Sequence, residues 1–257
     1  MRRAGRGWRA ITTLVTASLW LVSCAPATYQ PGGSPESVVQ QVEYYPYQVK
    51  GYQNSYAKRR ILILMPVDVH QAAASSSGIP AQPSPGNVAI GVTEDASGRP
   101  VQELYSTPIA PVVQNAIEQS ATEAGLIATA SPASVYAPVK DLKVDYVLES
   151  RIVKCWVDKR PGPGGEAGPA WFSSAEFALE VTIYKPPFSV PFWQGKSGSN
   201  YDDPPMDSNA ISPEDETAVY AQPVQVLSVA MTRAVAGIFN RTELYALVND
   251  DRMSARR

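Results

Sequence analysis

Few residues of this 257-residue chain could do chemistry. His70 is the only histidine, so a catalytic triad or a histidine-bound metal would have to be built around it. It follows an apolar run and precedes a low-complexity stretch, and the sequence contains no nucleophile elbow, phosphate-binding glycine loop or Cys/His metal spacing. The pattern therefore predicts no histidine-based catalysis, no metal and no cofactor.

Carboxylates are the second group with chemical potential. They are densest in two tripeptides, Tyr-Asp-Asp and Glu-Asp-Glu, which supply Asp202, Asp203, Glu214 and Glu216. Paired carboxylates can hydrolyse glycosidic bonds or bind calcium, so these residues are the candidates for a hydrolase. Their proline-bearing surroundings favour solvated loops instead.

Cys24 has the clearest pattern around it. The first nine residues contain four arginines and no acidic residue, and residues 10–22 are apolar or small apart from hydroxyls. That is the layout of a signal peptide, and the apolar run is shorter than the about 20 residues that cross a bilayer. The run ends in Leu21, Val22 and Ser23, directly before Cys24.

These four residues resemble the lipobox of bacterial lipoproteins, in which signal peptidase cuts before a cysteine that carries diacylglycerol. The resemblance implies that the peptidase recognises the three residues before Cys24, that this cysteine is lipidated and labels with palmitate, and that residues 1–23 are removed. Ala25 lacks the aspartate that favours inner-membrane retention in enterobacterial lipoproteins. The expected location is therefore the periplasmic face of the outer membrane.

The mature chain would be acidic. Removing residues 1–23 removes four arginines and no acidic residue, which leaves 18 Lys and Arg against 24 Asp and Glu and a net charge of −6. Its cationic clusters at 58–60 and 256–257 are short, so no nucleic-acid partner is expected. With Cys24 lipidated, Cys155 is the remaining thiol, and its apolar, strand-like surroundings predict a buried small hydrophobe.

Hydrophobic periodicity predicts the elements that would position any site. The predicted strands are 61–65, 88–92, 101–105, 126–128, 141–158, 171–184 and 190–195. Alternation over 171–184 indicates a strand with one wet face, and 88–92 with 101–105 is typical of a hairpin. In 141–158 the apolar phase changes near Ile152 and Val153, which predicts a β-bulge there.

Two amphipathic helices are predicted. Residues 108–124 repeat apolar side chains on one face, with Thr107 as the cap, Pro108 in the first position and Gly125 as the stop. A second apolar stripe runs over 224–239. This order of elements predicts an α+β domain with a mixed, largely antiparallel sheet and both helices packed on one face.

The chain is predicted to comprise a signal peptide (1–23), a lipid-anchored tether (24–57), one α+β periplasmic domain (58–248) and a polar tail (249–257). The tether is rich in Pro, Gly, Ser, Gln and Tyr and shows no period. Its aromatic segment 42–47 either waits for a partner or packs as an extended arm on its own domain.

Residues 58–66, 124–126, 144–152 and the strand around Trp193 resemble small outer-membrane lipoproteins of two groups. These are the ABC-type transport auxiliary lipoproteins, and the lipoproteins of curli secretion and peptidoglycan-synthase activation. The lipid tether, the α+β core and the lack of catalytic groups favour a binding or assembly role with an envelope protein partner, as in an accessory of an envelope transport system, and no enzymatic activity. An envelope hydrolase that uses the loop carboxylates and a purely structural lipoprotein are the alternatives.

Overall fold

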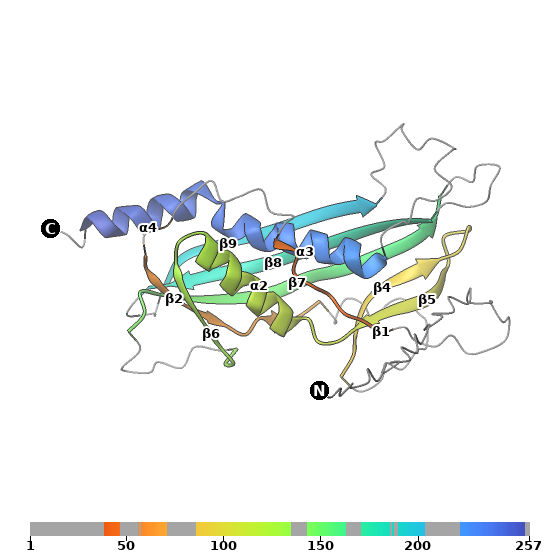
Figure 1. The fold of residues 1–257 in the computed structure, drawn as a ribbon, viewed down its shortest axis with the longest axis horizontal. Coiled ribbons are helices and arrows are strands. Elements are labelled where there is room, and N and C mark those ends of the chain that lie inside the picture. The colour runs from red at the N-terminus through yellow and green to blue at the C-terminus, as the bar shows by residue number, and fades with distance from the viewer. Residues whose placement is uncertain are drawn as a thin grey trace, which may run out of the picture. The chain divides into compact units, whose positions relative to one another are not determined.

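One long strand, β7, organises the sheet. In the computed structural model it runs over Tyr146–Pro161, and along one edge it pairs antiparallel with β8, Trp171–Tyr184, over almost its whole length. β8 pairs in the same way with β9, Pro191–Asp203. These three strands run side by side along the domain (Figure 1).

The structure describes residues 39–46, 56, 58–70, 86–134, 143–162, 171–185, 187, 190–203 and 222–254, the last five of these without their side chains. All belong to one compact unit, which spans Pro35–Arg257. The predicted signal peptide, the low-complexity stretch 71–85 and the carboxylates at 214–216 lie outside the described residues.

Short strands fill the other edge of β7 and extend the sheet on that side. They are β1 (Val39–Gln40), β2 (Arg60–Leu64), β3 (Val67–Asp68), β4 (Val88–Glu94), β5 (Pro100–Ser106) and β6 (Ile127–Ser131). β2, β3 and β4 pair with β7 one after another, all parallel to it. β6 lies parallel to β2, while β5 lies antiparallel to β4 and parallel to β1. The sheet of nine described strands is therefore mixed, and most of its paired residues are antiparallel.

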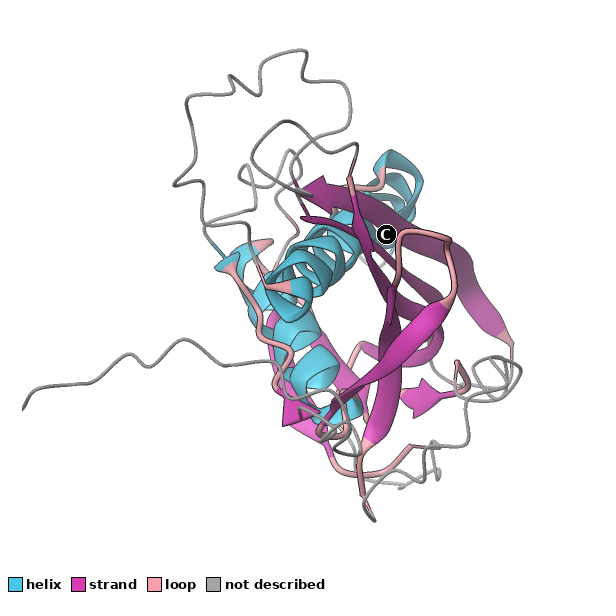
Figure 2. Cartoon of the chain, turned by 90° about the vertical axis from the view of Figure 1, so that its right-hand side faces the viewer, coloured by secondary structure: helices cyan, strands magenta, loops and turns pink. Residues whose placement is uncertain are grey.

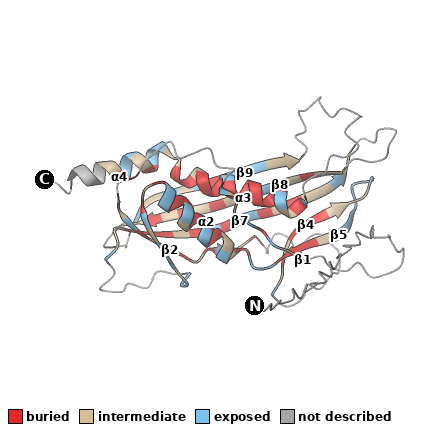
Figure 3. Ribbon diagram, in the orientation of Figure 1, coloured by how far each residue is buried: buried red, intermediate tan, exposed pale blue. Residues whose placement is uncertain are grey.

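Two helices, α2 (Ala110–Glu123) and α3 (Pro223–Phe239), cover one face of this sheet (Figures 1 and 2). The apolar stripe of α3 packs against β7, β8 and β9, whereas α2 packs against β2, β6 and α3, and all of these contribute to a single core. Figure 3 shows buried residues in red on α3 and on the strands of the sheet. The predicted α+β class, with a largely antiparallel sheet and two helices on one face, is confirmed.

The two strongest strand predictions are also confirmed. In β8 every second residue from Ser173 to Ile183 is buried, which is the alternation of a strand with one solvated face. In β7 the pairing with β8 shifts between Ile152 and Lys154, so Val153 is the extra residue of a bulge. After this bulge Cys155 faces the core, as the change of apolar phase predicted.

The predicted start of the first helix is wrong. α2 begins at Ala110 with Ile109 as its N-cap, no side chain caps it, and Thr107 lies outside the helix. Pro111 explains the shift. In a helix begun at Pro108 it would be the fourth residue, whose amide should donate to the cap carbonyl, whereas in a helix begun at Ala110 it lies in the first turn, where no donor is needed. Gly125 ends the helix as predicted, with a φ of 98° that favours glycine.

The predicted boundary between the domain and the polar tail, after residue 248, falls inside a helix. This further helix, α4, spans Thr242–Ser254, and its Leu244 and Val248 are buried. These two side chains and Tyr56 line a small apolar space beside the end of α3. The apolar residues of α4 are concentrated in 244–248, little more than one turn, which is too short to show a helical period. No helix of the described residues is long and apolar enough to cross a membrane.

The predicted tether is wrong over 39–46. Of the two alternatives for the aromatic segment, a free segment that waits for a partner and an arm packed on its own domain, the structure shows the packed arm. We call residues 39–46 the N-terminal arm. Val42 lies in the core, the Glu43 amide donates to Ser228 Oγ at 2.9 Å, and the Tyr45 amide donates to Thr232 Oγ1 at 3.0 Å. Two residues of extended chain span about 6.6 Å and one helical turn of four residues about 6 Å, so alternate amides of the arm meet successive turns of α3.

Candidate functional site

The predicted lipidation site lies outside the described residues. Cys24 and the three residues before it, Leu21, Val22 and Ser23, precede Val39, where the description of the domain begins. Lipidation and cleavage therefore stay predictions from the sequence.

Of the candidate carboxylates, Asp202 and Asp203 are described, at the end of β9, and both are half-buried. They pair in register with Ser174 and Ser173 of β8, and the Ser174 hydroxyl donates a hydrogen bond to Asp202. This bond ties Asp202 to the neighbouring strand. Glu214 and Glu216 lie outside the described residues, so the pairing of the two acidic groups stays a prediction.

His70, the single histidine, is bound at both of its ring nitrogens. It is 4% exposed, Nδ1 donates to Asp68, and Nε2 donates to the carbonyl oxygen of Ala89 at 3.0 Å. Both partners are acceptors, so the arrangement fits a doubly protonated imidazolium. Burial alone would lower the pKa of His70, but the hydrogen bonds to Asp68 and Ala89 and the charge of Asp68 raise it above its ordinary value.

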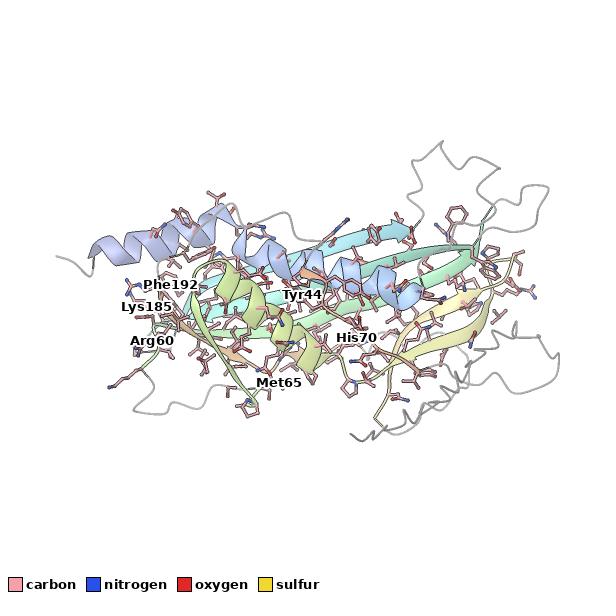
Figure 4. The ribbon with its side chains drawn as sticks, in the orientation of Figure 1. Tyr44, Arg60, Met65, His70, Lys185 and Phe192 are labelled. Atoms are coloured by element: carbon pink, nitrogen blue, oxygen red, sulfur yellow. The ribbon has the colours of Figure 1, made fainter. Side chains whose placement is uncertain are left out.

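The position of His70 explains why a polar group is buried there. β3 is only two residues long and ends beside the bulge of β7, with Asp68 opposite Ile152. β4 begins next along β7, and its pairing with β5 shifts just after Ala89. His70 therefore links the end of β3 to the start of β4 where backbone pairing is interrupted. Figure 4 shows it between these strands, beneath the helix layer.

Cys155 is the other group with nucleophilic chemistry in this region. Its side chain is 1% exposed, and burial, with a smaller contribution from the charge of Asp68, raises the pKa of its thiol far above the ordinary value. A thiol held neutral in this way is a poor nucleophile. The prediction that Cys155 is a buried small hydrophobe is confirmed. Within the described part of the chain, no cluster of His, Cys, Asp and Glu could hold a metal ion.

The solvated face of β8 and β9 carries the arrangement best suited to contacting another molecule. Lys196 of β9 lies opposite Glu180 of β8, with Nζ 2.6 Å from Oε1, and Arg151 of β7 reaches the same carboxylate at 4.0 Å. The hydrogen bond from Lys196 lowers the pKa of Glu180. A shallow hollow of about 350 Å³ lies here, with Thr182 and Gln194 in its lining. We call this the sheet-face hollow.

The charges around this hollow contribute little to the stability of the fold. Lys196 is exposed, Lys154 and Glu176 form a second exposed pair at 3.6 Å, and such pairs are worth about 0–1 kcal/mol each. Charged groups of this kind steer association and fix the orientation of a partner. The sheet face opposite the helices is therefore the candidate binding surface of the described domain.

Comparisons with known proteins find solved structures of low similarity to this chain. No family model matches the chain, and no curated protein matches it. Protein XCC0632 from Xanthomonas campestris, of family DUF330, has 12% identity and a TM-score of 0.39 and covers 85% of this chain and 97% of its own. PelC from Paraburkholderia phytofirmans, solved as a dodecamer, has 8% identity and a TM-score of 0.33, with 75% and 96% covered.

Lipoprotein GNA1162 from Neisseria meningitidis is also similar, with 14% identity and a TM-score of 0.23, over 58% of this chain and 88% of its own. With TM-scores below 0.5, none of these likenesses assigns a family or an activity. The function has to be argued from the residues of this chain.

The sequence reasoning missed both the link made by His70 and the sheet-face hollow. The spacing Asp68-Val69-His70 was a usable signal for the first, since residues two apart on an extended chain project to the same side. Its other partner, Ala89, could not have been found, because 19 residues separate it from His70. For the hollow, the signal was the wet face of 171–184, which carries Glu176, Glu180 and Thr182.

Proposed function

We propose that this chain is a lipoprotein of the bacterial cell envelope whose domain binds an envelope protein and does no catalysis. The observation that carries the proposal is the sequence Leu-Val-Ser-Cys ending at Cys24, behind an apolar run and four arginines. Lipid on Cys24 anchors the chain, and the lack of aspartate at Ala25 favours the periplasmic face of the outer membrane. An accessory role in an envelope transport or assembly system suits an anchored binding domain.

The absence of catalysis is supported by the state of the two groups best able to perform it. His70 has both ring nitrogens engaged and is 4% exposed, so a substrate cannot reach either nitrogen without displacing Asp68 or Ala89. Cys155 is buried with a neutral thiol. A general base or a nucleophile needs contact with its substrate, which neither of these side chains offers.

Replacing Cys24 by serine is expected to abolish lipidation. The wild-type protein should begin at Cys24, carry the mass of its acyl chains and label with a palmitate analogue, whereas Cys24→Ser should remain an unlabelled precursor. Intact mass and labelling in cells check this. Cys155→Ser, at the only other cysteine, is the matched control and should label normally. Labelling that survives Cys24→Ser, or that is lost in Cys155→Ser, contradicts the anchor.

Fractionation tests the membrane. After separation of inner and outer membranes on a density gradient, the wild-type protein is expected in the outer-membrane fractions. Ala25→Asp, which supplies the missing aspartate, should move it toward the inner membrane. Recovery of the wild-type protein with the inner membrane would overturn the outer-membrane assignment and leave the lipid anchor intact.

A photo-crosslinking amino acid at Gln194 is expected to capture the envelope partner, because this exposed side chain lines the sheet-face hollow. The same probe at Gln119, exposed on α2 on the opposite layer, is the control and should give no adduct. Crosslinking in intact cells, followed by mass spectrometry of the adduct, is the measurement. An adduct at Gln119 and none at Gln194 would place the partner on the helices instead.

A further inference from the structure

One end of the sheet gathers basic side chains from strands that meet there. The amides of Arg60 and Asp145 link the start of β2 to the start of β7, and the Arg60 guanidinium donates to the carbonyl of Lys143 at 3.4 Å. The end of β8 and the start of β9 reach the same level, since Tyr184 pairs with both Val147 and Pro191. We call the residues Lys58, Arg59, Arg60, Lys143 and Lys185 the basic end.

Acidic residues only partly offset the positive charge of this end. Asp145 is the acidic residue at the strand ends, paired with Arg59 at 3.5 Å. Glu149 lies further along β7 and interacts with Tyr184, and the adjoining helices add Glu123, Glu243 and, just before α4, Arg241. Lys58, Arg60 and Lys143 are all exposed.

The opposite end of the sheet has the reverse balance. Its acidic residues are Glu94, Asp95, Asp158, Asp202 and Asp203, and its basic residues are Arg99, Lys159 and Arg160. The register of β4, β7, β8 and β9 brings these residues to one level. The described part of the domain is therefore polarised, although the mature chain as a whole is acidic.

Apolar side chains project among the basic ones. Val190, just before β9, is 70% exposed and Ile127, opposite Arg60 in register, is 47% exposed. Phe192 is half-buried, with its ring 5.4 Å from that of Tyr146. Figure 4 shows Arg60, Lys185 and Phe192 together at this end. Such a surface, with exposed aliphatic side chains among cationic ones and an aromatic ring just behind them, binds the headgroup region of anionic bilayers.

We propose that the basic end docks on a bilayer surface that carries anionic phospholipid, in the membrane that holds the lipid on Cys24. This inference rests on the proposed function, because the anchor keeps that surface at high local concentration. The 15 residue steps from Cys24 to Val39 span at most about 50 Å. Eleven residues of β7, about 36 Å at ~3.3 Å each, separate the basic end from the level at which β4 pairs with β7. The connection from Cys24 to Val39 is therefore long enough for the lipid and the basic end to reach the same membrane.

Vesicle binding of the unlipidated chain separates this surface from the anchor. The mature chain with Cys24→Ser is mixed, at low salt, with vesicles of phosphatidylethanolamine containing one quarter phosphatidylglycerol, and with vesicles of phosphatidylcholine alone. We expect it to sediment with the anionic vesicles only. The combined variant Lys58→Glu, Arg60→Glu, Lys143→Glu should weaken this binding roughly 100-fold or more, from the typical effect of each basic residue near such a surface. Val190→Ser, which removes an exposed apolar side chain without changing the charge, should also weaken this binding.

The matched control reverses the three basic residues of the opposite end, with Arg99→Glu, Lys159→Glu and Arg160→Glu. It should bind the anionic vesicles far more strongly than the first variant does. Melting temperatures of the variants should differ little, since five of the six substituted side chains are exposed and Lys159 is half-buried over the Trp171 ring. Failure to bind anionic vesicles, or equal loss in both triple variants, overturns the docking surface. Vesicle binding by a chain that proves unlipidated in cells would retain the surface and reject the anchor.

Discussion

Replacing Val42 by aspartate is expected to destabilise the domain by roughly 3–5 kcal/mol, because it places a carboxylate in an apolar site without a partner. Val42 is 1% exposed and belongs to the same core as α2 and α3. The neighbouring amides of Glu43 and Tyr45 are held by Ser228 and Thr232, so the arm cannot move the new charge into solvent without losing both hydrogen bonds. Urea unfolding of the mature chain, followed by circular dichroism, measures the change.

Val39→Asp is the matched control, since Val39 lies three residues earlier on the same arm and is 44% exposed. It should cost less than about 1 kcal/mol, as is usual for surface substitutions. Equal, small effects of the two variants would show that the arm is dispensable and that residues 39–46 act as part of a tether after all. A large effect of Val42→Asp alone establishes that the folded domain begins before residue 58.

The layers of the fold could be predicted because each is encoded by local periodicity. The alternation in 171–184 gave β8 with its bounds, the apolar stripe over 224–239 gave α3, and one phase change located the bulge at Val153. These patterns depend on which side of an element faces the core, and that information lies in neighbouring residues.

The arm, α4 and the His70 link could not be predicted in the same way, because their partners are distant in sequence. Glu43 and Tyr45 bind residues 185 and 187 positions later, so nothing near the arm distinguishes it from a tether. Of the candidate site residues, Cys24 rests on a local motif and stays a prediction. Asp202 and Asp203 end β9, and their pairing with Glu214 and Glu216 also stays a prediction, because those two residues lie outside the described part of the chain. Surfaces such as the basic end could not be predicted either, because they form only when the ends of four strands, distant in sequence, meet at one end of the sheet.

His70 should make the stability of the domain depend on pH in a defined direction. His70 holds its proton more tightly in the folded protein than in the unfolded chain, since Asp68 and Ala89 raise its pKa despite its burial. The stabilisation is therefore complete below about pH 6.5, the ordinary histidine value, and is lost as the pH rises through the higher pKa of the folded state. Once neutral, the ring can donate to only one of its two acceptors.

Substituting His70 by leucine should accordingly cost about 3 kcal/mol at pH 6, where Asp68 and Ala89 both lose a donor, and less at pH 9. Urea unfolding of wild type and variant across this range measures the difference, and Asp68→Asn should reduce its pH dependence by removing the charge that favours the imidazolium. Because the chain has one histidine, its ring resonances need no assignment, and a proton NMR titration of the folded protein reads its pKa directly. A value at or below 6.5, or a cost of His70→Leu that is the same at every pH, would show that the ring is neutral in the fold and that the link between β3 and β4 carries no charge.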